Sequence, residues 1–369
     1  MNKCIGIINL DENESKMGEL VNNRPLAAIP IAARYRVIDF VLSNMTNSGI
    51  ENIGIFTKRK SRALINHLSN GRPWDLNKKR DGLRVFNFEY EGPEKDDVHN
   101  FADNIEFIKY SRCKYIIMSS SYMVCNIDYN DVLKSHINSK NDITVVCKEV
   151  ENTNNSFLNC DILNINKDGK VLSVGENIGK NKKGNNFNME MYILSAELFI
   201  EIVEESIRSG QYKKIKNYIR SNLDKLNVGT YMFKGYTACI NSLESYYTTN
   251  MDLLKNNVSN ELFFGSNQIY TKAKDEAPTN YTESSNVKNS IIANGCCIEG
   301  TVKNSIIGRR VHVSKGARVE NCIILQNSII GRNCTINKVI ADKGSEIKAG
   351  ENYIGAEGNL VFIKISNIL

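Results

Sequence analysis

The last third of the chain repeats a short apolar pattern, and this repeat restricts the fold more than any other feature of the sequence. Aliphatic residues recur every six positions in two series, Ile307, Val313, Val319 and Ile324, Ile330, Ile336. Gly308 and Gly331 each follow an aliphatic position directly. Such a period is typical of a left-handed parallel β-helix, whose short strands stack apolar side chains inward. A β-sandwich is the alternative, but it would not give so regular a spacing.

The preceding part of the chain predicts an α/β domain. An apolar strand at 4–10, a helical pattern at 34–50 and a second strand at 53–56 form a β-α-β opening. Further apolar strands are expected at 115–118, 143–146 and 191–194, with helices at 102–110 and 196–207. We therefore predict an α/β domain over 1–261, a linker over 262–284 and the β-helix over 285–369.

Composition excludes several classes of protein. The net charge of +6 is spread along 369 residues, and the basic runs are short and lack interleaved aromatics, which argues against a nucleic-acid surface. The ten cysteines are scattered without a CxxC motif, so we expect reduced thiols and a cytoplasmic location. We expect neither an export signal nor a membrane anchor, because no apolar stretch approaches eighteen residues.

Four segments together resemble glucose-1-phosphate adenylyltransferase, also called ADP-glucose pyrophosphorylase. They are RYRVIDFVLSNMTNSGI at 34–50, YIIMSSSYMVCNIDY at 115–129, the helical segment from SLESY at 242–246 to NMDLL at 250–254, and the hexapeptide tail. The first is highly specific to that family, whereas the tail is shared with many acyltransferases. The resemblance implies a Rossmann-like nucleotidyltransferase domain, a C-terminal left-handed β-helix, and a tetramer that joins ATP and glucose 1-phosphate into ADP-glucose and pyrophosphate with Mg²⁺.

The catalytic positions that the resemblance implies have changed in this chain. The family's two metal-binding aspartates align with Tyr122 and Cys239, and its sugar-phosphate lysine aligns with Asn177, although the adjoining Glu176 is retained as a candidate sugar contact. Neither a phenol nor a thiol is a good ligand for Mg²⁺. The family's glycine-rich phosphate loop is replaced by 9–16, NLDENESK, whose acidic residues are expected to face the triphosphate.

Some effector-binding positions are retained. The resemblance implies that activating sugar phosphates bind between the two domains, and the aligned basic residues are Arg24, Arg36 and Lys343. Arginine in such a cleft can bind phosphate by paired hydrogen bonds. The alternative is that these arginines form structural ion pairs with residues such as Asp39.

We find no replacement for the lost chemistry in the sequence. The four histidines, His67, His99, His136 and His312, have no partner at metal-ligand spacing, so we expect no metal or other cofactor to be bound by this chain. Ser121 follows a strand but has no nearby base signature.

These features match the D-type, non-catalytic subunit of the family, which accompanies a catalytic subunit that carries the Mg²⁺. We therefore expect a regulatory chain of glycogen biosynthesis that responds to a sugar phosphate. We expect it to form a hetero-oligomer, a tetramer, with a catalytic adenylyltransferase. Two alternatives stay open: a weakly active adenylyltransferase, and a sensor of sugar nucleotides or sugar phosphates.

Overall fold

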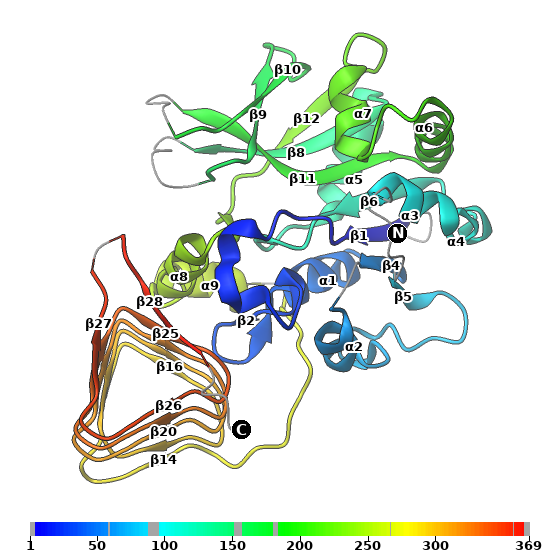
Figure 1. Ribbon diagram of the computed structural model, residues 1–369. Helices are drawn as coiled ribbons and strands as arrows, with labels where there is room; N and C mark the ends of the chain where they lie inside the picture. Colours follow the sequence, from blue (N-terminus) through cyan, green and yellow to red (C-terminus); the bar gives the residue numbers. More distant parts are fainter. Residues whose placement is uncertain are drawn as a thin grey trace.

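The chain folds into an α/β part and a triangular β-helix that lie against each other (Figure 1). The computed structural model describes residues 4–57, 60–87, 96–150, 157–179, 184–265, 267–356 and 358–364. The expected fold class, a nucleotidyltransferase-like α/β domain followed by a left-handed β-helix, is confirmed.

A mixed sheet forms the centre of the α/β part. Its main path runs β10-β9-β11-β6-β1-β4-β5, and β8 pairs with β11 and β12. The strands are β1 (Cys4–Asn9), β4 (Asn52–Thr57), β5 (Gly82–Asn87), β6 (Tyr115–Ser119), β8 (Ile143–Val150), β9 (Asp161–Ile165), β10 (Val171–Glu176), β11 (Asn185–Ser195) and β12 (Val228–Met232). Strands β1, β4, β5 and β6 are parallel, so the carboxyl ends of β1 and β6 meet at one edge.

Helices cover both faces of this sheet, because side chains alternate along each strand. Ile5 and Ile7 of β1 pack with helices on one face, and Cys4 and Ile8 belong to the core on the other. The first group of helices is α3 (Asp97–Asp103), α4 (Ile105–Ser111), α6 (Ala196–Ser209) and α7 (Ile215–Ser221). The second is α1 (Val37–Asn47), α2 (Arg62–Leu68), α5 (Tyr129–Ser139), α8 (Leu243–Asp252) and α9 (Asn256–Phe263).

One expected helix is corrected by the structure. The pattern at 102–110 predicted a single helix, but α3 ends at Asp103 and α4 begins at Ile105. Asn104 lies between them in a non-helical conformation, and its side-chain amide donates to the Asn100 carbonyl at 2.9 Å. An asparagine that satisfies a local carbonyl in this way competes with helix continuation.

The β-helix consists of three parallel sheets, each with five described strands (Figure 1). The first holds β14 (Asn280–Tyr281), β17 (Cys297–Ile298), β20 (His312–Val313), β23 (Ile329–Ile330) and β26 (Glu346–Ile347). The second holds β15 (Asn286–Lys288), β18 (Thr301–Lys303), β21 (Arg318–Glu320), β24 (Thr335–Asn337) and β27 (Asn352–Ile354). The third holds β16 (Ile291–Ile292), β19 (Ile306–Ile307), β22 (Ile323–Ile324), β25 (Val339–Ala341) and β28 (Val361–Ile363).

The connection between the two parts is shorter than the linker expected from the sequence. Helix α9 continues to Phe263, and Asn280–Tyr281 of β14 already pairs with β17. The connecting segment therefore spans 264–279 rather than 262–284.

The third sheet of the β-helix faces the α/β part. Ile306, Ile323 and Ile340 occupy one register position on successive coils, and all three are buried in the core that also holds α1 and α8. Their neighbours Ile307 and Ile324 point into the β-helix instead. Among the described residues, no helix is both long enough and apolar enough to cross a membrane.

Candidate functional site

A cavity of about 380 Å³ opens at the carboxyl ends of β1 and β6. This is the edge at which open α/β sheets bind ligands, and where the sequence predicted chemistry. The wall includes the loop after β1, the turn after β6, and residues of β9, β11 and the start of α7. The charged lining residues are Asp11, Glu12, Asp97, Asp161, Glu176, Glu190, Lys16, Lys214 and Lys216.

The loop after β1 brings a carboxylate to the place where the resemblance implies a bound phosphate. Glu12 accepts a hydrogen bond from the backbone N–H of Ser121 at 2.6 Å, so one donor of the turn after β6 is already occupied. Burial raises the pKa of Glu12 to about 7, against the opposing effect of the hydrogen bonds with Ser121. Glu14 was expected to face the triphosphate too, but its carboxylate accepts from Leu26 N–H at 2.6 Å, outside the cavity lining.

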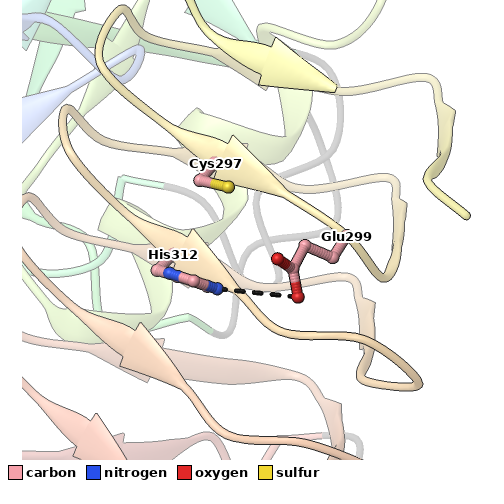
Figure 2. A group of neighbouring side chains, drawn as sticks. All are labelled: Cys297, Glu299 and His312. Carbon is pink, nitrogen blue, oxygen red and sulfur yellow. Dashed lines mark ion pairs between the residues drawn. The ribbon is translucent and has the colours of Figure 1, made fainter. Parts of the chain in front are cut away.

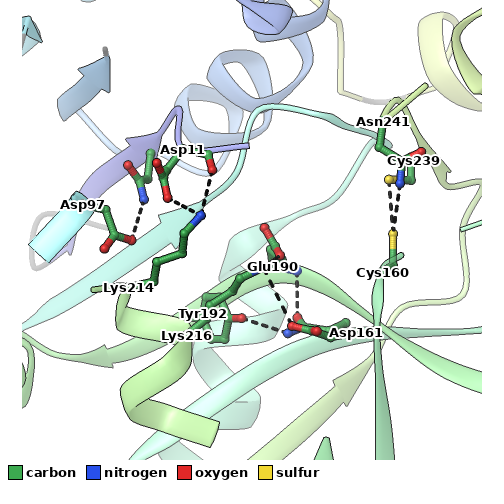
Figure 3. Close-up of polar contacts among 12 residues, drawn as sticks. Asp11, Asp97, Cys160, Asp161, Glu190, Tyr192, Lys214, Lys216, Cys239 and Asn241 are labelled. Atoms are coloured by element: carbon green, nitrogen blue, oxygen red, sulfur yellow. Dashed lines mark hydrogen bonds and ion pairs between the residues drawn. The ribbon is translucent and has the colours of Figure 1, made fainter. Parts of the chain in front are cut away.

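Two lysines reach into the cavity and form ion pairs there (Figure 3). The Lys214 ammonium lies 2.5 Å from the Asp11 carboxylate, and the Lys216 ammonium lies 2.6 Å from Glu190 and 4.0 Å from Asp161. Six carboxylates and three lysines line the cavity in all. A cavity with this balance repels anions, because its cations are outnumbered and two of the three already have carboxylate partners.

The structure brings Tyr122 and Cys239 together, as their alignment with two metal-binding positions implies. Cys239 of β13 (Ala238–Cys239) pairs with Met123 of β7 (Met123–Val124), directly after Tyr122. Burial raises the pKa of both groups well above their ordinary values; Glu190 contributes for Tyr122, and the hydrogen bond with Cys160 contributes for Cys239. The two sulfurs of Cys160 and Cys239 are 3.4 Å apart (Figure 3).

These groups do not fit Mg²⁺. A protonated phenol and a buried thiol beside a second thiol offer no hard anionic oxygen. Within the part of the chain that the structure describes, the cavity carboxylates form no group of three with ligand atoms close enough to share an ion. We therefore derive no catalytic step through a metal at this site.

Asn177 and Glu176 have separate environments. Asn177 is fully buried; its amide donates to the Phe157 carbonyl at 2.9 Å and its side-chain oxygen accepts from Gly179 N–H at 3.0 Å. It holds its own loop and is absent from the cavity lining. Glu176 does line the cavity, as a contact to a sugar would require. The Asn177 amide is neutral and lies outside the cavity, so it supplies no positive charge to a phosphate.

The candidate effector residues lie at the junction of the two parts. The Arg24 guanidinium forms an ion pair with Asp342 of the β-helix, next to Lys343, and its Nε donates to the Leu20 carbonyl at 2.9 Å. Arg24 thus makes a structural ion pair, but its partner is Asp342 rather than Asp39. The contact links the α/β part to the β-helix.

Arg36 belongs to a group of cations at this junction, which we call the junction cations: Arg24, Arg36, Lys274 and Arg309. The Arg36 guanidinium donates to the Ala28 carbonyl. Burial, together with the charges of Arg24 and Arg309, lowers the pKa of Arg36 to about 10. Burial and the charges of Arg309 and Arg36 likewise lower the pKa of Lys274. Asp39 accepts from the Arg36 backbone N–H at 2.8 Å and lies 2.5 Å from the His67 ring.

Sequence reasoning missed several of these charged residues. Lys214 immediately precedes α7, Lys216 lies in its first turn, and Arg309 lies at a corner of the β-helix; none of them stands in a recognisable motif. The two lysines on either side of the buried Ile215 were the available signal, but their spacing alone does not place them at the cavity.

Comparison with known proteins agrees with the domain order. Residues 15–256 match the nucleotidyl transferase family model, and residues 275–359 match the GlmU-like C-terminal hexapeptide model. The glycogen biosynthesis protein GlgD of Bacillus subtilis is 36% identical over 367 residues, which cover 98% of this chain and 96% of that protein.

Two further relatives are also similar over most of their length. GlgD of Geobacillus stearothermophilus is 38% identical over 86% of this chain and 83% of that protein. The glucose-1-phosphate adenylyltransferase of Fervidobacterium nodosum is 30% identical over 95% of this chain and 85% of that protein. The resemblance drawn from the sequence motifs is therefore confirmed: this chain belongs to the nucleotidyl transferase family, in the group that contains the GlgD proteins and the glucose-1-phosphate adenylyltransferases.

Proposed function

We propose that this chain is a regulatory, non-catalytic subunit of a glucose-1-phosphate adenylyltransferase in cytoplasmic glycogen biosynthesis. Its partner would be a catalytic subunit in a hetero-oligomer, with a tetramer as the expected assembly and with Mg²⁺ chemistry confined to that partner. The relatives named GlgD support the pathway. The main support for the loss of catalysis is the cavity. It lies at the sheet edge where the family's active site is expected, but carboxylates outnumber lysines in its lining.

The reaction would bring several negative charges into this cavity. ATP and glucose 1-phosphate are polyanions, and their approach needs cations and free backbone N–H donors. Here the Ser121 N–H already binds Glu12, while Lys214 and Lys216 are paired with carboxylates. Each unscreened contact between a phosphate and one of these carboxylates would cost on the order of 1 kcal/mol or more.

The regulatory part of the proposal rests on the junction cations. Burial and the like charges of Arg24 and Arg309 depress the Arg36 pKa, so an anion bound among these three residues would relieve repulsion. A sugar phosphate at this place would touch both the α/β part and the β-helix, near Lys343. Binding there would favour one arrangement of the two parts and could be passed on to a neighbouring subunit.

The decisive experiment measures ADP-glucose formation from ATP and glucose 1-phosphate with Mg²⁺. Three preparations are compared: this chain alone, the catalytic subunit alone, and the two co-expressed. We expect no turnover by this chain alone and a higher rate, or a changed sugar-phosphate response, in the mixture. Turnover by the isolated chain near the rate of the catalytic subunit would show that it is an enzyme and would refute the proposal.

A second experiment tests the lost metal site directly. Restoring both carboxylates by Tyr122→Asp and Cys239→Asp should leave the isolated chain inactive, because Glu12 still occupies the Ser121 N–H. Adding Glu12→Gly to the pair removes that obstacle and is the matched comparison. Activity from the double variant alone would contradict the role assigned to Glu12.

The effector site is tested in the co-expressed complex with Arg36→Ala. We expect a weaker response to sugar phosphates with an unchanged rate in their absence. Arg318→Ala is the control, since Arg318 is exposed on an outer face of the β-helix. An unchanged response in Arg36→Ala would refute the effector-binding role of the junction cations. It would not bear on the proposed loss of catalysis.

A further inference from the structure

An outer face of the β-helix gathers three side chains that are typical metal ligands. Cys297, Glu299 and His312 lie with one ligand atom each within 4.8 Å of the others (Figure 2). The Glu299 carboxylate is 3.8 Å from Nε2 of His312. No other group of three such residues occurs in the described part of the chain. This group lies on the first sheet of the β-helix, away from the cavity.

Strand register explains why the three side chains meet. Cys297 of β17 pairs with His312 of β20, and the next pair, Ile298 with Val313, points into the β-helix. Cys297 and His312 therefore both point outward from adjacent strands, about 4.8 Å apart along the stack. Glu299 lies two residues after Cys297 and so returns to the same outer side.

The backbone holds this arrangement in place. Glu299 N–H donates to the Val313 carbonyl at 2.8 Å, which keeps Glu299 beside the strand that carries His312. The Glu299 carboxylate also accepts from Lys315 N–H at 3.1 Å, an outer contact of the kind that orients metal-binding carboxylates. The three side chains are only partly buried, so an ion in solution can reach them.

We propose that Cys297, Glu299 and His312 form a Zn²⁺ site on the β-helix. Sulfur and imidazole together select zinc or a similar transition metal and disfavour Mg²⁺ and Ca²⁺. Ligands at about 2.0 to 2.3 Å from the ion require the three atoms to move slightly closer than they now lie. One thiolate and one carboxylate neutralise the ion, and three protein ligands leave a fourth position for water.

The structure gives His312 two neighbours of ligand type, Cys297 and Glu299, which its sequence spacing did not indicate. The proposed site, if occupied, would replace the expectation that the chain binds no metal. Motif searches look for ligands two to five residues apart, whereas Cys297 and His312 are one full coil apart along the chain. The β-helix converts that separation into a contact between adjacent strands. The inference does not depend on the proposed regulatory function.

The test uses the full chain, stripped of metal with a chelator and then titrated with Zn²⁺ in competition with a chromophoric chelator. We expect one equivalent to bind, and Co²⁺ in its place to give thiolate-to-cobalt charge-transfer absorption in the near ultraviolet. Cys297→Ser should abolish that absorption and weaken Zn²⁺ binding at least about 100-fold, more than the loss of an outer-shell partner would. His312→Ala should weaken binding to a similar extent.

Cys113→Ser and His99→Ala are the matched controls, because neither residue is fully buried and both lie in the α/β part. They should bind Zn²⁺ as the unchanged chain does. Circular dichroism of each variant checks folding, which outward-facing substitutions should preserve. The proposal is overturned if the unchanged chain binds no Zn²⁺, or if Cys297→Ser and His312→Ala bind it equally well.

Discussion

Glu12 offers the sharpest test of the charge balance in the cavity, through the substitution Glu12→Gln. Burial raises the Glu12 pKa from its ordinary value of 4.5 to about 7. Between these pH values the native state retains a proton that the unfolded state has released. The stabilising contribution of the protonated form is therefore complete below about pH 4.5 and is lost as the pH rises through 7.

The expected magnitude follows from the size of this shift. A change from 4.5 to about 7 corresponds to about 3 kcal/mol if all of it were retained. Glu12 is only half-buried beside an open cavity, so solvent screening reduces the figure, and we expect about 1 to 2 kcal/mol. Glutamine keeps an oxygen that can accept from the Ser121 N–H but never carries the charge.

The assay is urea unfolding followed by circular dichroism at pH 5 and pH 8. Glu12→Gln should exceed the unchanged chain in free energy of unfolding by about 1 to 2 kcal/mol at pH 8 and differ little at pH 5. Glu201→Gln on the exposed surface of α6 should change it by less than about 0.5 kcal/mol at either pH. An equal gain for Glu12→Gln at both pH values, or no gain at pH 8, would refute the reasoning.

Two further predictions concern the β-helix and its junction. Gly308→Ala would place a Cβ 2.7 Å from the backbone nitrogen of Gln326. The free energy of unfolding in a urea titration should therefore fall by about 1 to 3 kcal/mol. Gly175→Ala, whose Cβ would have no neighbour within 4 Å, should leave it unchanged. Tyr247→Phe removes a 2.8 Å hydrogen bond to the Asn321 carbonyl of the β-helix and should lower the free energy of unfolding by about 1 kcal/mol in thermal unfolding. Tyr110 is 79% exposed, so an equal loss from Tyr110→Phe would contradict this explanation.

The fold was predictable because its repeats and strands leave strong local signals. The six-residue period fixed which aliphatic residues point inward, and Ile307, Ile324 and Ile330 are all buried inside the β-helix. The period could not show that Ile306 and Ile323 face the α/β part, since an outward position is apolar only where another element covers it. The break at Asn104 was missed because a local side-chain contact outweighed the helical pattern.

The candidate site was only partly predictable. Alignment implied that Tyr122 and Cys239 lie near each other, and they do, because short strands pair next to them. It could not show that Glu12 binds the Ser121 N–H or that Lys214 pairs with Asp11, since both contacts join segments far apart in the sequence. Contacts of this kind depend on where loops end in space, which the residue pattern of a single loop does not determine.

The stripe of Ile306, Ile323 and Ile340 restricts how this β-helix can change in length. Repeat proteins usually tolerate gain or loss of a unit, because each unit contacts only its neighbours. Here the coils that carry the three isoleucines are buried against the α/β part. Asp342 lies on the same coil as Ile340 and is paired with Arg24. Deleting one central coil would carry Asp342 about 4.8 Å along the axis and remove one isoleucine from the shared core. Insertions and deletions are therefore expected to accumulate at the ends of the stack, while the middle coils keep a fixed number.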